Sequence, residues 1–288
     1  MRPWTPCKNA DALDFFRPEV IANIRAVGEE PRMHCKQWEY AQLLEVRQKL
    51  AANARRLVGI GCGCEKTIPL VGRGAERCTV TDLYGREDAW QTAHANPKRV
   101  FPEMTNLEVH SMDMRRVDLP KRSADFVWSL CAVEHAGTLL DIISAVRQAG
   151  ELLDEDGLLF ISTELNLGKR DYRTSNTVFL SRPMITQIVQ SSGLHLFAPI
   201  ELRISDHPMN TPVSSAIEPD VFGQVVYRDQ KNALQGTMAT VVSFVLGRRD
   251  RGVREVWNVD PAYEQTLAKL VKRGRRLSRR LTPPWRWW

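Results

Sequence analysis

The sequence predicts an α/β protein built on a doubly wound, mainly parallel, seven-stranded sheet. Apolar runs of strand length alternate with helical patterns, which is typical of parallel sheets. A Gly-X-Gly turn at 61–63 follows the first of these runs, and Asp82 ends the second. A glycine turn admits a ligand close to the backbone, and an acid at the next strand tip can accept hydrogen bonds from a ribose diol. The pattern therefore indicates a nucleoside cofactor.

The individual elements follow from local patterns. Helical spacing predicts an N-terminal helical cover, and Gly and Asp clusters mark the steps from later helices into strands. No convincing helix separates the last two strands, so we expect the last strand to run antiparallel. Expected strands are 56–61, 78–82, 107–112, 124–130, 157–163, 194–204 and 238–247, and expected helices are 11–28, 36–54, 65–72, 138–152 and 181–192.

These elements divide the chain into three parts. We expect a helical cover at 1–54, a cofactor-binding domain at 55–247 and a basic tail at 248–288. Three long connections, 83–106, 164–180 and 205–237, are candidates for lids or binding loops, with ordered surface packing as the alternative.

The composition is that of an ordinary soluble globular protein. Of its 288 residues, 43% are hydrophobic and 26% are charged. No run approaches the roughly 18 apolar residues of a membrane-spanning helix, and the first residues have no apolar signal region. Six scattered cysteines are typical of buried thiols in a reducing compartment. Cys62 and Cys64 lack a second ligand pair, so we expect no zinc or other metal. The expected localisation is cytoplasmic.

The net charge of +6 is unevenly distributed. Residues 248–288 carry twelve Lys and Arg against four Asp and Glu, so the rest of the chain is nearly neutral. This distribution argues against general nucleic-acid affinity across the surface.

Four segments contain the polar residues at the edge of the sheet where we expect a ligand to bind, which we call the ligand edge. They are the turn at 61–63, Asp82, Asp113 with its flanking methionines, and the strand at 123–130 that leads into Glu134-His135. All lie at carboxyl ends of parallel strands, where open α/β sheets bind ligands. Asp113 could accept a hydrogen bond from an adenine amine. Alternatively, strand-end acids cap helices.

The identity of the residue after the turn separates two cofactor classes. A dinucleotide-binding dehydrogenase needs a third glycine and a free helix N-terminus for its pyrophosphate. Glu65 lies two residues after Gly63, and its charge would repel a diphosphate. An acid suits S-adenosylmethionine, which carries a sulfonium and an amino group and no phosphate.

Residues 55–165 resemble a class I S-adenosylmethionine-dependent methyltransferase of the type 11 kind. The motifs are Leu57-Val-Gly-Ile-Gly-Cys-Gly63, Asp82, Asp113 with Leu119-Pro120 and Ser123-Ala-Asp-Phe-Val127, Glu134-His135 and Leu152–Leu159. The resemblance implies a Rossmann-like methyltransferase fold. It also implies a cofactor site made by Gly61, Cys62, Gly63, Glu65, Asp82, Leu83, Asp113, Met114 and Leu130.

Two positions depart from the family pattern. Gly59 stands where many members carry an acid, and Glu65 stands where many carry glycine. The missing acid normally contacts the methionine amino group, so we hypothesise that Glu65 replaces it.

A narrower resemblance concerns the acceptor. Trp38-Glu-Tyr40, Thr81–Tyr84 with Trp90, and Ser129–His135 are similar to segments of methyltransferases encoded among surface-polysaccharide genes. This resemblance implies a sugar, glycan or other small-molecule acceptor that is methylated on oxygen. His135 is the candidate general base because imidazole is the side-chain type most often used for general acid–base catalysis. The alternative is that His135 only caps or packs the following helix.

The tail combines charge with aromatic residues. Residues 260–281 could form a basic amphipathic helix, and Trp285, Trp287 and Trp288 end the chain. This pattern is typical of a peripheral membrane contact, here at the inner face through 260–288. RNA binding and a solvated or partner-docking arm are the alternatives. An RNA methyltransferase and a non-catalytic scaffold are therefore the competing functions. The sequence does not indicate an oligomeric state.

Overall fold

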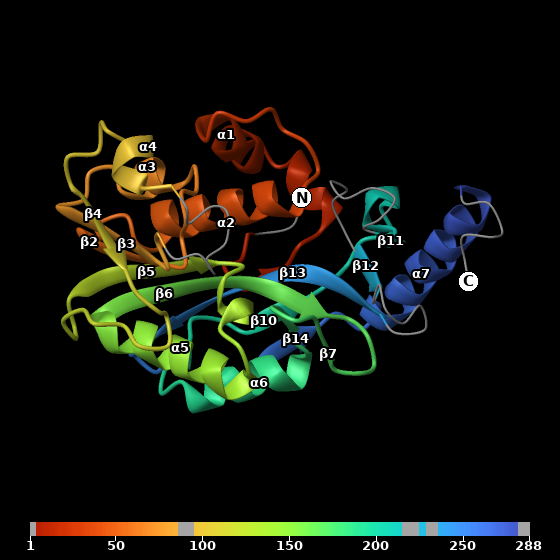
Figure 1. The fold of residues 1–288 in the computed structure, drawn as a ribbon. Coiled ribbons are helices and arrows are strands. Elements are labelled where there is room, and N and C mark those ends of the chain that lie inside the picture. The colour runs from red at the N-terminus through yellow and green to blue at the C-terminus, as the bar shows by residue number, and fades with distance from the viewer. Residues whose placement is uncertain (1–3, 86–94, 215–224, 229–235, 282–288) are drawn as a thin grey trace.

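The structure is a computed structural model that describes residues 4–85, 95–214, 225–228 and 236–281. Its centre is one sheet with helices on both faces (Figure 1). Five strands run parallel in the spatial order β4–β3–β2–β5–β6. They are β2 (Arg56–Ile60), β3 (Arg77–Asp82), β4 (Leu107–Ser111), β5 (Ala124–Leu130) and β6 (Leu153–Asn166). The predicted doubly wound, mainly parallel fold is confirmed.

The strand order reverses between β2 and β5. From β2 the chain moves outward through β3 to β4, and it then returns to β5 and moves the other way to β6. A crevice opens at such a reversal, at the carboxyl ends of the strands. This topology places the turn after β2 at the centre of the ligand edge.

The other half of the sheet is mixed. The long strand β13 (Gly236–Gly247) runs antiparallel to β6, as predicted for 238–247. Beyond it the sheet continues through short strands, so it has twelve strands among the described residues, against seven predicted. The short strands are β1 (Lys8–Asn9), β9 (His195–Leu196), β10 (Ile200–Leu202), β11 (Val213–Ser214), β12 (Val225–Arg228) and β14 (Trp257–Val259).

The predicted strand 194–204 is divided into β9 and β10. Pro199 lies between them and has no N–H to donate to a ladder. β9 pairs with β13, whereas β10 pairs with β1, which lies between β10 and β13. The N-terminal segment therefore contributes a strand to the sheet as well as helices, which the sequence analysis did not expect.

The first predicted helix is interrupted. Residues 11–28 form a 3₁₀ helix, η1 (Ala12–Phe16), followed by α1 (Pro18–Ala26). Arg17 is extended between them, with φ −84° and ψ 129°, because a residue before proline avoids helical geometry. The second predicted helix is α2 (Cys35–Lys49), and its polar residues Glu39 and Glu45 are buried.

The remaining helices complete both layers. Figure 1 shows α1 and α2 over one face of the sheet, and α5 (Leu139–Leu152) and α6 (Arg182–Ser191) over the opposite face. The short helix α3 (Ile68–Val71) follows the turn after β2. The long connections contain α4 (Pro97–Val100), the hairpin β7 (Tyr172–Arg173)–β8 (Val178–Phe179), and η4 (Pro208–Asn210). Trp90 lies outside the described residues.

The first part of the basic tail packs against the rest of the protein. Strand β14 pairs with β10, and α7 (Tyr263–Leu281) follows it. Leu267 and Leu270 of α7 are buried in the main core, so part of the predicted apolar stripe faces the protein. Arg273 pairs with Asp206 at 2.9 Å. The terminal tryptophans lie outside the described residues. No helix in the described part of the chain has the length and apolar character needed to cross a membrane.

A buried ion pair joins η1 and α2. The Arg17 guanidinium donates to both carboxylate oxygens of Glu45, at 2.8 and 2.5 Å, and the Glu45 side chain is fully buried. Lys49 also contacts Glu45, at 2.8 Å. Replacing Arg17 by Met would leave the buried carboxylate with one partner.

We predict that Arg17→Met lowers the free energy of unfolding by about 3 kcal/mol, since breaking one side of a buried pair leaves a poorly compensated charge. The control is Arg55→Met. Arg55 pairs with Glu76 at 2.8 Å, but both side chains are more than half exposed, so its loss should cost less than about 1 kcal/mol. Urea unfolding measures both variants, and equal losses would contradict the prediction.

Candidate functional site

The glycine-rich turn connects β2 to α3 in a conformation that requires glycine. Gly61 and Gly63 have φ of +65° and +49°, in the left-handed region that favours glycine. A Cβ on Gly61 would lie 2.6 Å from the Ala132 Cβ and 3.0 Å from the Met114 Cε. The N–H groups of Gly61 and Cys62 donate to the Thr81 carbonyl, at 2.8 and 3.2 Å. The turn is thus held against the end of β3.

Asp82 fixes the same turn from the end of β3. Its carboxylate accepts hydrogen bonds from the N–H of Gly63, at 2.8 Å, and from the N–H of Leu83, at 2.7 Å. The Tyr84 hydroxyl donates to the Gly63 carbonyl at 2.6 Å. A carboxylate has about four acceptor positions, so Asp82 can still accept hydrogen bonds from the two hydroxyls of a diol. The prediction that it binds ribose stays a prediction.

Glu65 places a buried carboxylate beside the turn. Its Oε1 lies 3.1 Å from the Lys36 Nζ, and its Oε2 is buried with no hydrogen-bond partner among the described residues. Burial raises the pKa of Glu65 to about 7, although the Lys36 ammonium opposes the shift. An orphaned buried oxygen of this kind is costly unless a donor meets it. A cationic amino group fits this position.

Lys36 comes from the first turn of α2. Its ammonium also lies 3.4 Å from the Glu39 Oε2 and 3.3 Å from the Leu130 carbonyl. These carboxylate neighbours raise the pKa of Lys36 well above its usual value, against the effect of burial. Sequence reasoning missed both Lys36 and Glu39, because no local pattern shows that α2 reaches this edge.

The structure explains why position 59 has no acid. A Cβ on Gly59 would lie 2.2 Å from the Cys62 Sγ and 2.6 Å from the Trp128 Cζ2. Trp128 is fully buried in β5. Only glycine fits between these two side chains, so a carboxylate for the cofactor would have to come from another position. That Glu65 replaces it stays a prediction.

The other predicted cofactor residues surround the same edge. Leu130 is buried at the end of β5, and Met114 packs partly buried against the core near the turn. Asp113 follows β4, and both of its carboxylate oxygens contact the Arg115 guanidinium. This ion pair was not expected from the sequence. An adenine contact by Asp113 stays a prediction.

A second group of buried polar side chains lies at the ends of β5 and β6. Glu134 is buried, its Oε2 accepts from the Thr163 hydroxyl at 3.0 Å, and its Oε1 has no partner among the described residues. Burial raises the pKa of Glu134 to about 7. Ser162 donates to Glu39 at 2.8 Å. Polar residues at 162–164 within an otherwise apolar strand were the available sequence signal.

His135 is held by the 164–180 connection. Its Nδ1 lies 2.8 Å from the Asn176 carbonyl oxygen and 3.1 Å from the Thr177 hydroxyl. These contacts join His135 to the β7–β8 hairpin and are compatible with either of its predicted roles. Its role as a general base stays a prediction.

The cysteines are all unpaired with one another. Burial raises the pKa of Cys62 and Cys131 well above the usual value, so both are thiols. Over the residues that the structure describes, no group of three or more His, Cys, Asp or Glu could hold a metal ion.

Comparisons with known proteins agree with this geometry. Residues 58–161 match the model of a methyltransferase domain family, whereas no curated protein matches the chain significantly. One similar structure, from Galdieria sulphuraria, is described as a sarcosine dimethylglycine methyltransferase. It has a TM-score of 0.50 and 11% identity over 80% of this chain and 99% of that one. At this identity the likeness shows a shared fold.

Another similar structure is an S-adenosylmethionine-dependent methyltransferase from Mesorhizobium loti. It has a TM-score of 0.46 and 16% identity, over 72% of this chain and 97% of that one. The family match covers the turn, Asp82, Asp113 and the end of β5. Residues 58–161 therefore match a methyltransferase domain, in agreement with the predicted resemblance to class I S-adenosylmethionine-dependent methyltransferases.

Proposed function

We propose that this protein methylates a hydroxyl group of a sugar, a glycan or another polar small molecule. When bound, S-adenosylmethionine supplies an electrophilic methyl group on its sulfonium. The observation in this chain that best supports this cofactor is the Glu65 Oε2, which is buried without a hydrogen-bond partner among the described residues and lies next to the glycine-rich turn. This oxygen can accept a hydrogen bond from the cofactor's amino group.

The other predicted site residues would contact different parts of the cofactor. The backbone at 61–63 allows close approach, Asp82 would receive the ribose hydroxyls, and Met114 and Leu130 would border the cofactor as apolar side chains. Asp113 would receive the adenine amine. Methyl transfer is an in-line displacement, so alignment of the acceptor and exclusion of water carry most of the catalysis.

The polar ends of β5 and β6 support a hydroxylated acceptor. The Glu134 Oε1 is buried with no hydrogen-bond partner among the described residues, so it could accept from a hydroxyl of the acceptor, whereas an apolar acceptor would leave it unmatched. The narrower resemblance to polysaccharide-pathway methyltransferases supports a glycan among such acceptors. Either His135 or Glu134 could take the hydroxyl proton, because the pKa of Glu134 lies at about 7.

The tail gives weaker support for a membrane or nucleic-acid partner. Leu267 and Leu270 are buried and cannot enter a lipid surface, whereas Lys269 and Lys272 of α7 are exposed. A peripheral membrane contact through 260–288 stays a prediction. RNA methylation remains the alternative function, and it requires nucleic-acid affinity that falls steeply with salt.

We predict that label from methyl-labelled S-adenosylmethionine appears in sugar or glycan acceptors. The assay offers monosaccharides, nucleotide sugars, cell-surface polysaccharide and total RNA to the full-length protein. Transfer to a hydroxyl of a sugar-containing acceptor is the expected result. Label found only in RNA, with affinity that falls steeply with salt, would contradict the glycan assignment and favour the alternative.

We predict that Glu65→Gln weakens binding of S-adenosylhomocysteine by about 10- to 100-fold, since a hydrogen bond to a charged group contributes about 1.5–3 kcal/mol. Calorimetric titration measures the dissociation constant. Glu76→Gln, at an exposed carboxylate, is the control and should bind normally. Gly59→Asp should not restore binding to Glu65→Gln, because Trp128 and Cys62 fill that space. Unchanged affinity in Glu65→Gln refutes the role of this carboxylate.

We predict that S-adenosylhomocysteine binds more tightly as pH rises through about 7. The free protein holds a proton on Glu65 below this pH, because burial raises its pKa to about 7. A cationic amino group prefers the ionised carboxylate, so affinity should fall by up to about tenfold per pH unit below 7. Lys36 opposes the pKa shift of Glu65, whereas Glu39 and Asp82 add to it.

The control for this pH effect is Glu65→Gln, which should bind with little pH dependence between 6 and 8. Calorimetry at several pH values measures both proteins. The same slope in the wild type and in Glu65→Gln would show that another group, such as Glu134, is responsible.

A further inference from the structure

A cavity of about 430 Å³ lies in the N-terminal part of the molecule, and none of its lining residues belongs to the glycine-rich turn. Residues 4–17 provide eight of the ten side chains that line it. The other two come from β10 and from the residue just after it. The lining residues are Trp4, Lys8, Asn9, Asp11, Leu13, Asp14, Phe16, Arg17, Glu201 and Arg203.

The cavity lies near the same edge of the sheet as the cofactor site. β1 and β10 run parallel to each other and, through β13 and β6, in the same direction as β2. Their carboxyl ends therefore face the ligand edge. Two strand steps separate β1 from β6, and three separate it from β5, whose ends carry the proposed acceptor groups; this corresponds to about 10–14 Å along the sheet.

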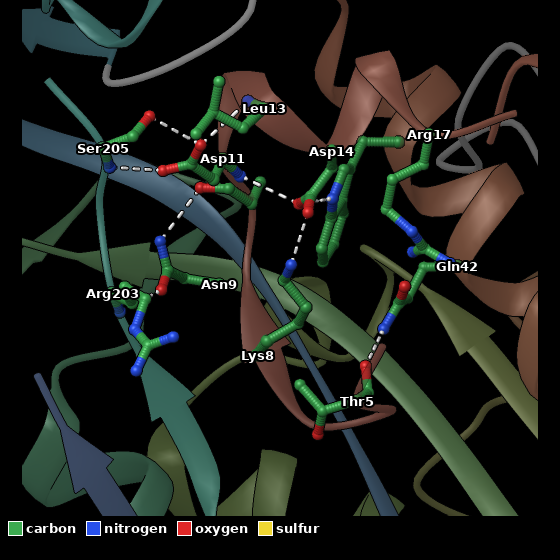
Figure 2. Close-up of polar contacts among 12 residues, drawn as sticks. Thr5, Lys8, Asn9, Asp11, Leu13, Asp14, Arg17, Gln42, Arg203 and Ser205 are labelled. Carbon is green, nitrogen blue, oxygen red and sulfur yellow. Dashed lines mark hydrogen bonds and ion pairs between the residues drawn. The ribbon is translucent and has the colours of Figure 1, made fainter. Parts of the chain in front are cut away.

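The cavity wall is held by hydrogen bonds within the protein (Figure 2). Asp11 accepts from the Ser205 N–H at 2.5 Å and from its hydroxyl at 2.7 Å. The Asn9 Oδ1 accepts from the Arg203 N–H at 2.8 Å. The Asp14 carboxylate accepts from the Lys8 Nζ at 2.5 Å. Because the wall is already ordered, a ligand would enter a preformed site.

The charges of the lining exclude an anion as the natural occupant. Each of its three cations already has an acidic partner: Lys8 pairs with Asp14, Arg17 with Glu45 and Arg203 with Asp260. A phosphate or a nucleotide would need a cation that is not already paired.

Hydrogen-bonding capacity remains at the wall. The Glu201 carboxylate, which lines the cavity, has no hydrogen-bond or ion-pair partner among the described residues. The Trp4 Nε1 is buried and also has no partner among them. Phe16 is 56% exposed, with its ring in edge contact with His207 at 5.5 Å between centroids. Aromatic faces next to unmatched hydrogen-bonding groups suit a ring that carries C–H faces and hydroxyls.

We propose that this cavity binds a neutral sugar unit of the acceptor, at a subsite remote from the methylated hydroxyl. The proposal rests on the proposed function, because it assigns the acceptor to the carbohydrates. A distance of about 10–14 Å along the sheet exceeds one sugar ring, so the acceptor must contain more than one unit, and the enzyme recognises an oligosaccharide or a longer glycan. Methyl transfer then depends on a sugar unit that does not react.

The test is saturation-transfer NMR on the full chain without cofactor. The probes are glucose, galactose, mannose, N-acetylglucosamine and rhamnose, with glucuronate, inorganic phosphate and choline as charged comparisons. We expect at least one neutral sugar to bind, and Phe16→Ala or Glu201→Ala to weaken that binding at least fivefold. Leu140→Ala is the matched control, because Leu140 is 72% exposed on α5 away from the cavity.

Two readings separate this proposal from the proposed function. S-adenosylhomocysteine affinity should stay unchanged in Phe16→Ala, since the ring lies outside the cofactor site. The subsite proposal is overturned if no neutral sugar binds, if phosphate, glucuronate or choline binds more tightly, or if neither cavity variant weakens sugar binding. A failure of S-adenosylhomocysteine to bind the wild type would overturn the proposed function instead.

Discussion

The ion pair between Lys36 and Glu65 connects the N-terminal segment to the cofactor turn. The Glu65 side chain is only 10% exposed, and a carboxylate so far removed from water needs a charged partner or a donor. Lys36 supplies one partner from α2, and the second oxygen stays unmatched among the described residues. The position of α2 therefore sets the electrostatics of the cofactor site. If Glu65 binds the cofactor as proposed, the N-terminal segment is part of the binding site through Lys36.

Helix α2 also contacts the sugar-binding cavity proposed above. The Trp38 indole donates to Asp14 at 2.7 Å, and Glu45 binds Arg17. Lys36 and Trp38 are two residues apart, so one helix turn contacts the cofactor turn and the cavity wall. This arrangement gives a physical reason for three polar residues of α2. Lys36 contacts the cofactor turn, Glu39 accepts from Ser162 on β6, and Glu45 binds Arg17 at the end of η1. An amphipathic helix that only covered the sheet would not need them.

The sequence predicted the parallel strands and most helices, because their apolar runs are continuous and bounded by turn residues. It missed β1, since Lys8–Asn9 is a two-residue polar strand whose partners lie about 200 positions away. It identified Gly61, Glu65 and Asp82 as neighbours, because a parallel sheet brings its strand ends together. It could not place Lys36 or Glu39 there, because helix packing depends on tertiary contacts. The exclusion of an acid at position 59 by Trp128 is likewise visible only in three dimensions.

The central claim is that Glu65 holds the cationic end of the cofactor in place of an acid at position 59. A crystal structure of the full chain with S-adenosylhomocysteine tests it most directly. The account predicts that the ligand's amino nitrogen lies within hydrogen-bond distance of the Glu65 Oε2, the oxygen that lacks a partner now. An amino group bound by other residues, with Glu65 still contacting only Lys36, would contradict it.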